Sequence, residues 1–147
     1  ILTLGGIVFL AFRYVFTPTI IKKHSHFGSL TKDREVLISL DVKNKSLMEV
    51  KDIVVRDFVP GIAKVVPKFD SLKPTIREGQ NGTELFWRFD SLRPGEERIV
   101  AYRIKPVMDV VGSIRLPSAM ANYTNRKKQR KKIASSGISI HSHHKKK

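Results

Sequence analysis

Six basic side chains fall within seven consecutive residues near the C-terminus and form the strongest candidate for a binding surface. They are Arg126, Lys127, Lys128, Arg130, Lys131 and Lys132, with Gln129 between them. Clustered positive charge attracts acidic glycans, lipid headgroups or an acidic protein surface. A nucleic-acid site would also carry aromatic or several amide side chains, and here there is only Gln129. We therefore expect a protein subunit, glycan or lipid-headgroup partner before a nucleic acid. The alternative is a solvated hairpin tip whose charges prevent pairing with other sheets.

Three of the four asparagines open an N-x-S/T triplet, the acceptor pattern for N-linked glycosylation. They are Asn44, Asn81 and Asn122. Because such acceptors belong on extracytoplasmic surfaces, we expect all three side chains to be exposed at turns or strand edges. The alternative is coincidence, since Asn, Ser and Thr gather in turns anyway. Basic residues beside the apolar N-terminus would favour a cytoplasmic domain, but this rule loses force for a long folded domain.

Metal binding has weak support in the sequence. Imidazoles recur two residues apart at two places, His24/His26 and His141/His143/His144, which puts them on one face of an extended chain. Neither group has a carboxylate or a cysteine beside it, so we expect no metal site and no cofactor.

Catalysis has weaker support still. Ser135 and Ser136 have no His or Asp at a recognisable spacing, and the chain has no Gly-rich phosphate loop. Three separated aspartates, Asp52, Asp57 and Asp90, form no evident acid–base pair. We expect that the protein is not an enzyme.

Composition limits the class of protein. A chain of 147 residues with 41% hydrophobic residues can bury one core. The absence of cysteine excludes disulfides and thiolate metal sites. The net charge of +15 resembles that of a nucleic-acid binder, but residues 126–147 hold nine basic and no acidic residues. Residues 1–125 carry 19 basic against 13 acidic residues, a net +6, so the excess is mostly terminal.

The N-terminal stretch ILTLGGIVFLAFRYVF is apolar apart from Thr3 and Arg13. A bilayer span needs about 20 apolar residues, and only 12 precede Arg13. Because the chain begins with Ile, we expect residues 1–18 to be a partial transmembrane or hydrophobic anchor segment that upstream residues complete. A buried core helix or strand is the alternative. Pro18 would end the segment, and residues 19–33 would form an extended linker.

Residues 34–141 have the two-residue period of β-strands, as in Val36, Ile38, Leu40 and Val42. Runs of this kind lie at 36–43, 50–58, 62–66, 85–89, 98–104, 107–111, 112–116, 119–123 and 132–140, and residues 67–83 form the longest expected loop. Of these nine runs we expect seven or eight to be strands, and because no helical period is present they predict an all-β antiparallel sandwich. Residues 142–147 are expected to be a basic disordered tail.

The expected core centres on the one tryptophan, which lies midway between the turn signals Pro60-Gly61 and Pro94-Gly95. Leu85, Trp87 and Phe89 alternate with Phe86, Arg88 and Asp90, so one face of this strand is strongly apolar and the other is mixed. Tyr102 lies on the strand that follows the Pro94-Gly95 turn, where Gly95 is expected to adopt positive φ. We expect these four side chains to pack between the sheets.

The pattern of turns and core positions resembles a known family. It comprises Asn44-Lys45-Ser46, a strand ending Asp57-x-x-Pro60, the Trp87 strand, Leu92-x-Pro94-Gly95-Glu96, the Tyr102 strand, and Leu116-Pro117-x-Ala119 with Tyr123. This pattern is similar to the immunoglobulin-like conserved-repeat and CARDB-like modules of archaeal surface proteins, found beside S-layer and adhesin domains. The resemblance covers about residues 33–141 and implies an immunoglobulin-like sandwich outside the membrane, serving as a spacer or adhesion surface. The basic hairpin RKKQRKK departs from the short Gly- or Asp-containing turn expected there.

Three functions are therefore open. The sequence favours a membrane-anchored extracytoplasmic module of structural or adhesive type. A second hypothesis is a subunit of an extracellular filament or its stator, as in pilins and archaella, although these need a longer uninterrupted helix. The third is a cytoplasmic basic module that binds nucleic acid, which only the net charge supports.

Overall fold

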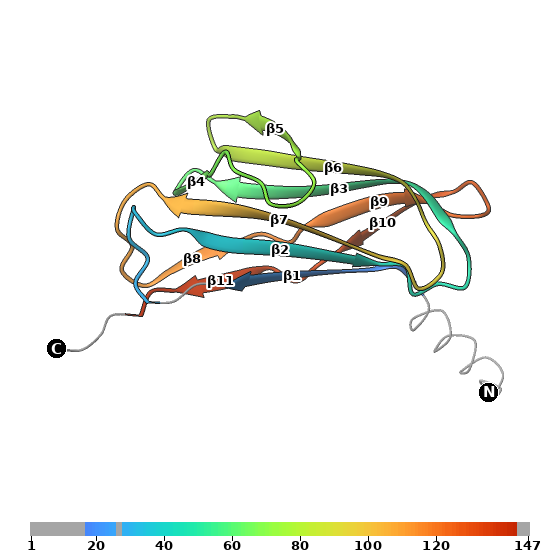
Figure 1. Ribbon diagram of the computed structural model, residues 1–147, viewed down its shortest axis with the longest axis horizontal. Coiled ribbons are helices and arrows are strands. Elements are labelled where there is room, and N and C mark those ends of the chain that lie inside the picture. The colour runs from blue at the N-terminus through green and yellow to red at the C-terminus, as the bar shows by residue number, and fades with distance from the viewer. Residues whose placement is uncertain (1–16, 26–27, 144–147) are drawn as a thin grey trace, which may run out of the picture.

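The computed structural model describes residues 17–25 and 28–143, and within them the chain is entirely β-structure (Figure 1). The strands are β1 (Thr19–Ser25), β2 (Val36–Lys43), β3 (Val50–Pro60), β4 (Ala63–Val65), β5 (Thr75–Glu78), β6 (Gly82–Leu92), β7 (Glu97–Pro106), β8 (Ser113–Leu116), β9 (Met120–Thr124), β10 (Arg130–Ala134) and β11 (Ile138–His141). They form one sheet in the order β1-β2-β7-β4, a second in the order β10-β9-β3-β6-β5, and the pair β11-β8. Every pairing is antiparallel. The fold is an immunoglobulin-like antiparallel β-sandwich, as the sequence predicts.

Strict alternation builds the core between the two large sheets. In β2 every second residue from Val36 is buried, and the inward residues of β3, β6 and β7 meet them. Trp87 is 1% exposed, its ring centre lies 5.9 Å from that of Tyr102, and its indole N–H donates to the Leu72 carbonyl over 3.0 Å. Leu85 is also fully buried, whereas Phe89 is only partly buried at the edge of the core.

Several expected boundaries are wrong. Residues 19–25 of the expected linker are the strand β1, which pairs with β2 along its whole length. The expected loop 67–83 contains β5, an edge strand on β6. Residues 107–111 form no strand, because only Val110 makes a bridge, to Leu30.

The last expected strand, 132–140, is two strands on different sheets. β10 pairs with β9 as far as Ala134, and Ser135 then fixes the break by accepting from and donating to the backbone of Ala119. Gly137 follows in the connection, and β11 pairs with β8 instead. These divisions raise the strand count within the described residues to eleven, against the seven or eight expected.

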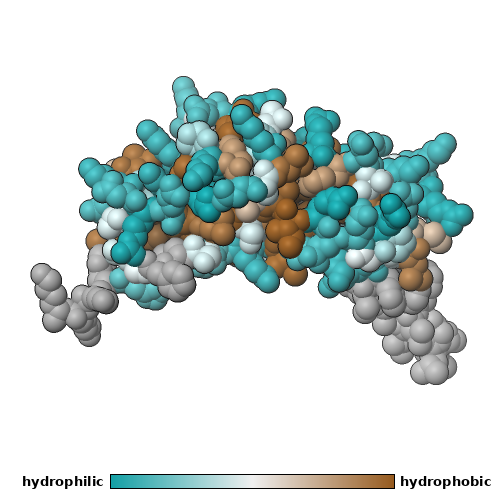
Figure 2. All heavy atoms as spheres, viewed as in Figure 1, coloured by the Kyte–Doolittle hydropathy of each residue, from teal (hydrophilic) through white to brown (hydrophobic). Residues whose placement is uncertain are grey.

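The surface seen in Figure 2 is mostly hydrophilic, with a hydrophobic band near the middle of the molecule. Residues 1–16, which hold the predicted anchor, and residues 144–147 of the predicted tail lie outside the described residues. Within the described residues, no helix is long and apolar enough to cross a membrane.

Candidate functional site

The basic cluster lies on the β9–β10 hairpin, at the end of the sandwich where β1 begins (Figure 1). Two hydrogen bonds close the turn. The backbone N–H of Asn125 donates to the backbone carbonyl of Gln129 over 3.0 Å, and the backbone N–H of Gln129 donates to Asn125 Oδ1 over 2.9 Å. Lys128 occupies the left-handed position of this turn with φ 59, where a glycine would be unstrained. All six basic residues of the cluster are exposed.

The six basic residues are not equivalent. Arg130 Nη1 donates to the Asp52 carbonyl over 2.5 Å and to Thr124 Oγ1 over 3.1 Å. Asp52 has φ 51 and sits where β3 shifts its register against β9, so Arg130 holds a β-bulge in place. Arg126, Lys127 and Lys128 make none of the ion pairs found among the described residues, so their charge is available to a ligand.

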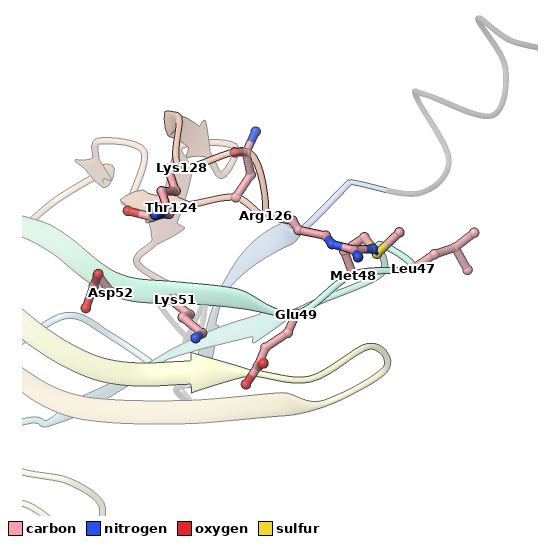
Figure 3. Close-up of a pocket in the computed structure, with 9 residues that line it drawn as sticks. Leu47, Met48, Glu49, Lys51, Asp52, Thr124, Arg126 and Lys128 are labelled. Atoms are coloured by element: carbon pink, nitrogen blue, oxygen red, sulfur yellow. The ribbon is translucent and has the colours of Figure 1, made fainter.

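A shallow groove of about 700 Å³ lies beside this hairpin (Figure 3). Its walls come from the β2–β3 turn and the start of β3 on one side and from the β9–β10 turn on the other. Arg126 reaches across it, with Nη1 3.2 Å from Met48 Sδ. Leu47 and Met48 are 59% and 46% exposed, so two adjacent apolar side chains stand beside three unpaired cations. The sequence did not suggest this apolar neighbour, because 78 residues separate Met48 from Arg126.

Of the three glycosylation candidates, the structure contradicts Asn44. Its side chain is fully buried, and Nδ2 donates to the carbonyls of Met48 and Leu92, each over 2.9 Å. Oδ1 accepts from the amide and hydroxyl of Ser46. Asn44 therefore braces the β2–β3 turn, and its Nδ2 is not accessible in the folded domain.

The other two candidates differ in exposure. Asn81 is exposed in the turn between β5 and β6, as an acceptor requires. Asn122 is half-buried in the middle of β9, between β10 and β3, so the expectation of a turn or strand edge is wrong for it. Asn81 is the acceptor that the structure favours.

A buried polar network that the sequence analysis missed joins the two large sheets. Lys22 Nζ on β1 donates to Asp57 Oδ1 on β3 over 2.7 Å and to the Pro117 carbonyl over 2.8 Å. The Tyr102 hydroxyl on β7 donates to Asp57 Oδ2 over 2.5 Å, and the Phe58 amide donates to Asp57 Oδ1 over 2.9 Å. The Lys22 and Asp57 side chains are both 0% exposed. The carboxylate of Asp57 on β3 thus binds side chains of β1 and β7 from the opposite sheet inside the core.

The surroundings of the network shift the pKa values of Lys22 and Tyr102. Burial lowers the pKa of Lys22 from its usual value, and the Asp57 carboxylate opposes this only in part. Burial, together with the charge of Asp57, raises the pKa of Tyr102 well above its usual value. The sequence contains a signal that could have revealed the site: Asp57 is in phase with the buried Val55 and Val59 of its strand. A charge in the inward phase must find a buried partner.

The histidine groups and the separated aspartates do not come together as a site. His24 lies in β1, His141 is the last residue of β11, and the backbone N–H of His143 donates to the Gly28 carbonyl. His26 and His144 lie outside the described residues. Over residues 17–25 and 28–143, no group of three metal-binding side chains is close enough to hold an ion.

No protein-family model and no curated protein sequence matches the chain. Solved structures do match it. BcpA, the major pilin subunit of Bacillus cereus, in a variant form, is 13% identical with a TM-score of 0.62, over 85% of this chain and 40% of the pilin. A non-cellulosomal cohesin from the hyperthermophilic archaeon Archaeoglobus fulgidus is 12% identical with a TM-score of 0.55, over 86% of this chain and 91% of the cohesin.

An immunoglobulin-like protein from Nocardia farcinica is 10% identical with a TM-score of 0.53, over 86% of this chain and 99% of that one. The chain thus spans less than half of the pilin but nearly all of the single-domain matches. At these identities the likeness defines the fold and no specific family. The domain is an immunoglobulin-like or cohesin-like sandwich of a type that also occurs in a pilin subunit.

Proposed function

We propose that this protein is a membrane-anchored, extracytoplasmic module with a structural or adhesive role and no enzymatic activity. The observation that carries the proposal is the junction between residues 1–16 and the sandwich. The sequence of residues 1–16 is apolar apart from Thr3 and Arg13, and β1 begins only three residues later, at Thr19. An anchor joined so closely to an edge strand would hold the whole sandwich at the membrane.

The buried network supports a role for β1 in resisting mechanical tension on the domain. Tension on the N-terminal segment would act first on this strand, which is the edge of its sheet. Besides its pairing with β2, β1 is held to the opposite sheet by Lys22 and Asp57. Peeling β1 away would break its ladder and also separate this buried ion pair, and leaving one buried charge without its partner costs about 3 to 5 kcal/mol.

The fold supports a surface location. The matched structures include a pilin subunit and a cohesin, and the archaeal origin of that cohesin agrees with the resemblance to repeat modules of archaeal surface proteins. Asn81 is the exposed acceptor that an extracytoplasmic location would offer for glycosylation. A protein subunit is the partner class that this fold favours, and the basic hairpin adds acidic glycans and lipid headgroups as candidate partners.

Membrane fractionation tests the anchor. The intact protein should stay in the membrane pellet after an alkaline carbonate wash, and a variant lacking residues 1–16 should move to the soluble fraction. A control in which the four apolar residues 7–10 are each replaced by Ser should behave like the deletion while keeping the length. Release of the intact protein by the wash would refute membrane anchoring.

A filament subunit is the second candidate, and the match to a pilin subunit favours it. In this case the sandwich would form the outer layer of a fibre. Electron microscopy of material sheared from native cells, labelled with an antibody to the domain, separates the candidates. Labelled fibres support the filament, and label confined to the cell envelope supports the anchored module.

A further inference from the structure

Three turns meet at the end of the sandwich where the described chain starts. The Gly95 amide, in the β6–β7 turn, donates to the Asn44 carbonyl in the β2–β3 turn over 2.7 Å. Lys51 of β3 pairs with Thr124, next to the β9–β10 turn. Thr19 of β1 pairs with Lys43 of β2, so β1 also begins at this end (Figure 1). We call this surface, made of residues 45–51, 93–96 and 125–129, the basal end.

The basal end is strongly basic and carries exposed apolar side chains at its rim. Its three segments hold six basic residues, Lys45, Lys51, Arg93, Arg126, Lys127 and Lys128, against the two acidic residues Glu49 and Glu96. All six basic residues are exposed. Leu47 and Met48 project among them. Cations around exposed apolar side chains are the chemistry of a surface that enters the interface of an anionic bilayer.

We infer that the basal end docks on the headgroups of anionic lipids, with Leu47 and Met48 inserted among them. The inference rests on the proposed membrane anchor. Only Thr17 and Pro18 separate the apolar sequence 1–16 from β1, and two residues span at most about 7 Å. If residues 1–16 enter the bilayer, the basal end must lie at its surface. An acidic polysaccharide would match the charges but would leave Leu47 and Met48 without a partner.

Docking fixes the orientation of the module. β11 ends at the opposite end of the sandwich from the start of β1 (Figure 1). With the basal end on lipid, the long axis stands away from the membrane and the far end, with Met108 in the β7–β8 connection, faces the surroundings. A partner would then meet the far end or the sides of the sandwich.

A single fluorophore can test this contact because the chain has no cysteine. The protein is produced with any natural residues that precede Ile1 and with Met48→Cys as its only cysteine. It is labelled with an environment-sensitive dye and reconstituted into vesicles of phosphatidylcholine alone or of an equal mixture with phosphatidylglycerol. Met48 is exposed and its contacts with Asn44 and Ser46 use the backbone carbonyl, so the substitution should preserve the turn. The matched control is Met108→Cys, at a methionine that is 63% exposed at the far end.

We expect the dye at position 48 to shift to the blue and to be quenched by lipids spin-labelled near the headgroup, in the anionic vesicles and less so in phosphatidylcholine alone. The dye at position 108 should behave as in water in both. Replacing Arg126, Lys127 and Lys128 together by Gln should abolish at least half of the shift at position 48. Replacing Lys64, Lys68 and Lys73, exposed residues outside the basal end, removes the same charge and should leave the shift unchanged.

The outcomes separate this inference from the proposed anchor. If the chain resists alkaline extraction from the vesicles but the dye at position 48 stays in water, the anchor stands and lipid docking is refuted. If the chain is extracted, both are refuted. If soluble heparin or polyglutamate produces the same shift on phosphatidylcholine vesicles, the basal end binds an acidic polysaccharide or protein, and the lipid assignment is wrong.

Discussion

Removing the buried amine of Lys22 should destabilise the domain far more than the loss of an exposed charge. In Lys22→Met, Asp57 keeps its bonds from Tyr102 and the Phe58 amide but loses its only cationic partner among the described residues. Breaking a buried ion pair by removing one partner costs about 3 to 5 kcal/mol, because the other charge stays buried. Such a loss is a large fraction of the roughly 5 to 15 kcal/mol by which domains are stable.

Two further variants test the reasoning behind that magnitude. Lys23→Met changes the neighbouring exposed lysine of β1 and should alter stability by less than about 0.5 kcal/mol. In Lys22→Met/Asp57→Leu no unpaired charge remains, but the Tyr102 hydroxyl and the Phe58 amide lose their acceptor, at about 1 to 3 kcal/mol each. The Pro117 carbonyl loses its lysine donor in both variants, so the double variant replaces one unpaired buried charge by two unpaired polar groups. Adding Tyr102→Phe removes the unpaired hydroxyl and should recover part of the lost stability.

Urea denaturation, followed by the fluorescence of the single buried tryptophan, measures all of these variants. The midpoint should be highest for Lys23→Met, and the triple variant should unfold at a higher urea concentration than the double variant. If Lys22→Met unfolds within about 1 kcal/mol of Lys23→Met, the ion pair does not hold β1 to the opposite sheet.

Three other predictions concern the core, a turn and a pH effect. Trp87→Ala, which removes the fluorescent probe, should cost about 3 to 5 kcal/mol in urea denaturation followed by circular dichroism, and a solvent-like emission spectrum of native Trp87 would contradict its burial. Gly95 has φ 77 with open space around its missing Cβ, so Gly95→Val should lose more stability than Glu96→Val through backbone strain alone, and equal losses in thermal unfolding would refute this. Burial, helped by Glu97, raises the pKa of Asp41, whose Oδ1 is buried without a hydrogen bond. The unfolded chain therefore ionises first as pH rises, stability falls through the window above pH 3.8, and Asp41→Asn should raise the Tm at pH 7 but not at pH 3.

The strand pattern was readable from the sequence where burial follows alternation without interruption. Val36 to Val42 and Leu85 to Trp87 show this, and Gly95 adopts the positive φ that its turn requires. β1 was hidden because Lys22 occupies an inward position, where a charge normally argues against burial. Its partner Asp57 lies 35 residues away on another sheet, and only the fold brings the two together.

The sequence predicts the basic residues of the candidate surface but not its apolar residues. The six basic residues fall within seven consecutive positions, so their exposure on one hairpin could be expected. Leu47 and Met48 join them through a contact across 78 residues, which periodicity does not encode. The acceptor triplet at Asn44 misled because an Asn in a turn can use its own amide to close it, as the bonds to Met48 and Leu92 show.

Glycosylation at Asn81 would give the extracytoplasmic location an independent mark. Protein from native cells should carry a glycan on the peptide containing Asn81 and none on the peptide containing Asn44, whose amide is buried. Peptide mass spectrometry reads both sites in one experiment. A glycan on Asn44 with Asn81 unmodified would contradict the accessibility that the structure gives them.

Labelling of lysines on intact native cells tests the central proposal most directly. A membrane-impermeant amine reagent, followed by peptide mass spectrometry, should modify the exposed Lys64, Lys68 and Lys73 before the cells are broken. Lys22, whose side chain is 0% exposed, should react only after the protein is unfolded. Modification of the three exposed lysines only after lysis would place the domain in the cytoplasm and contradict an extracytoplasmic module.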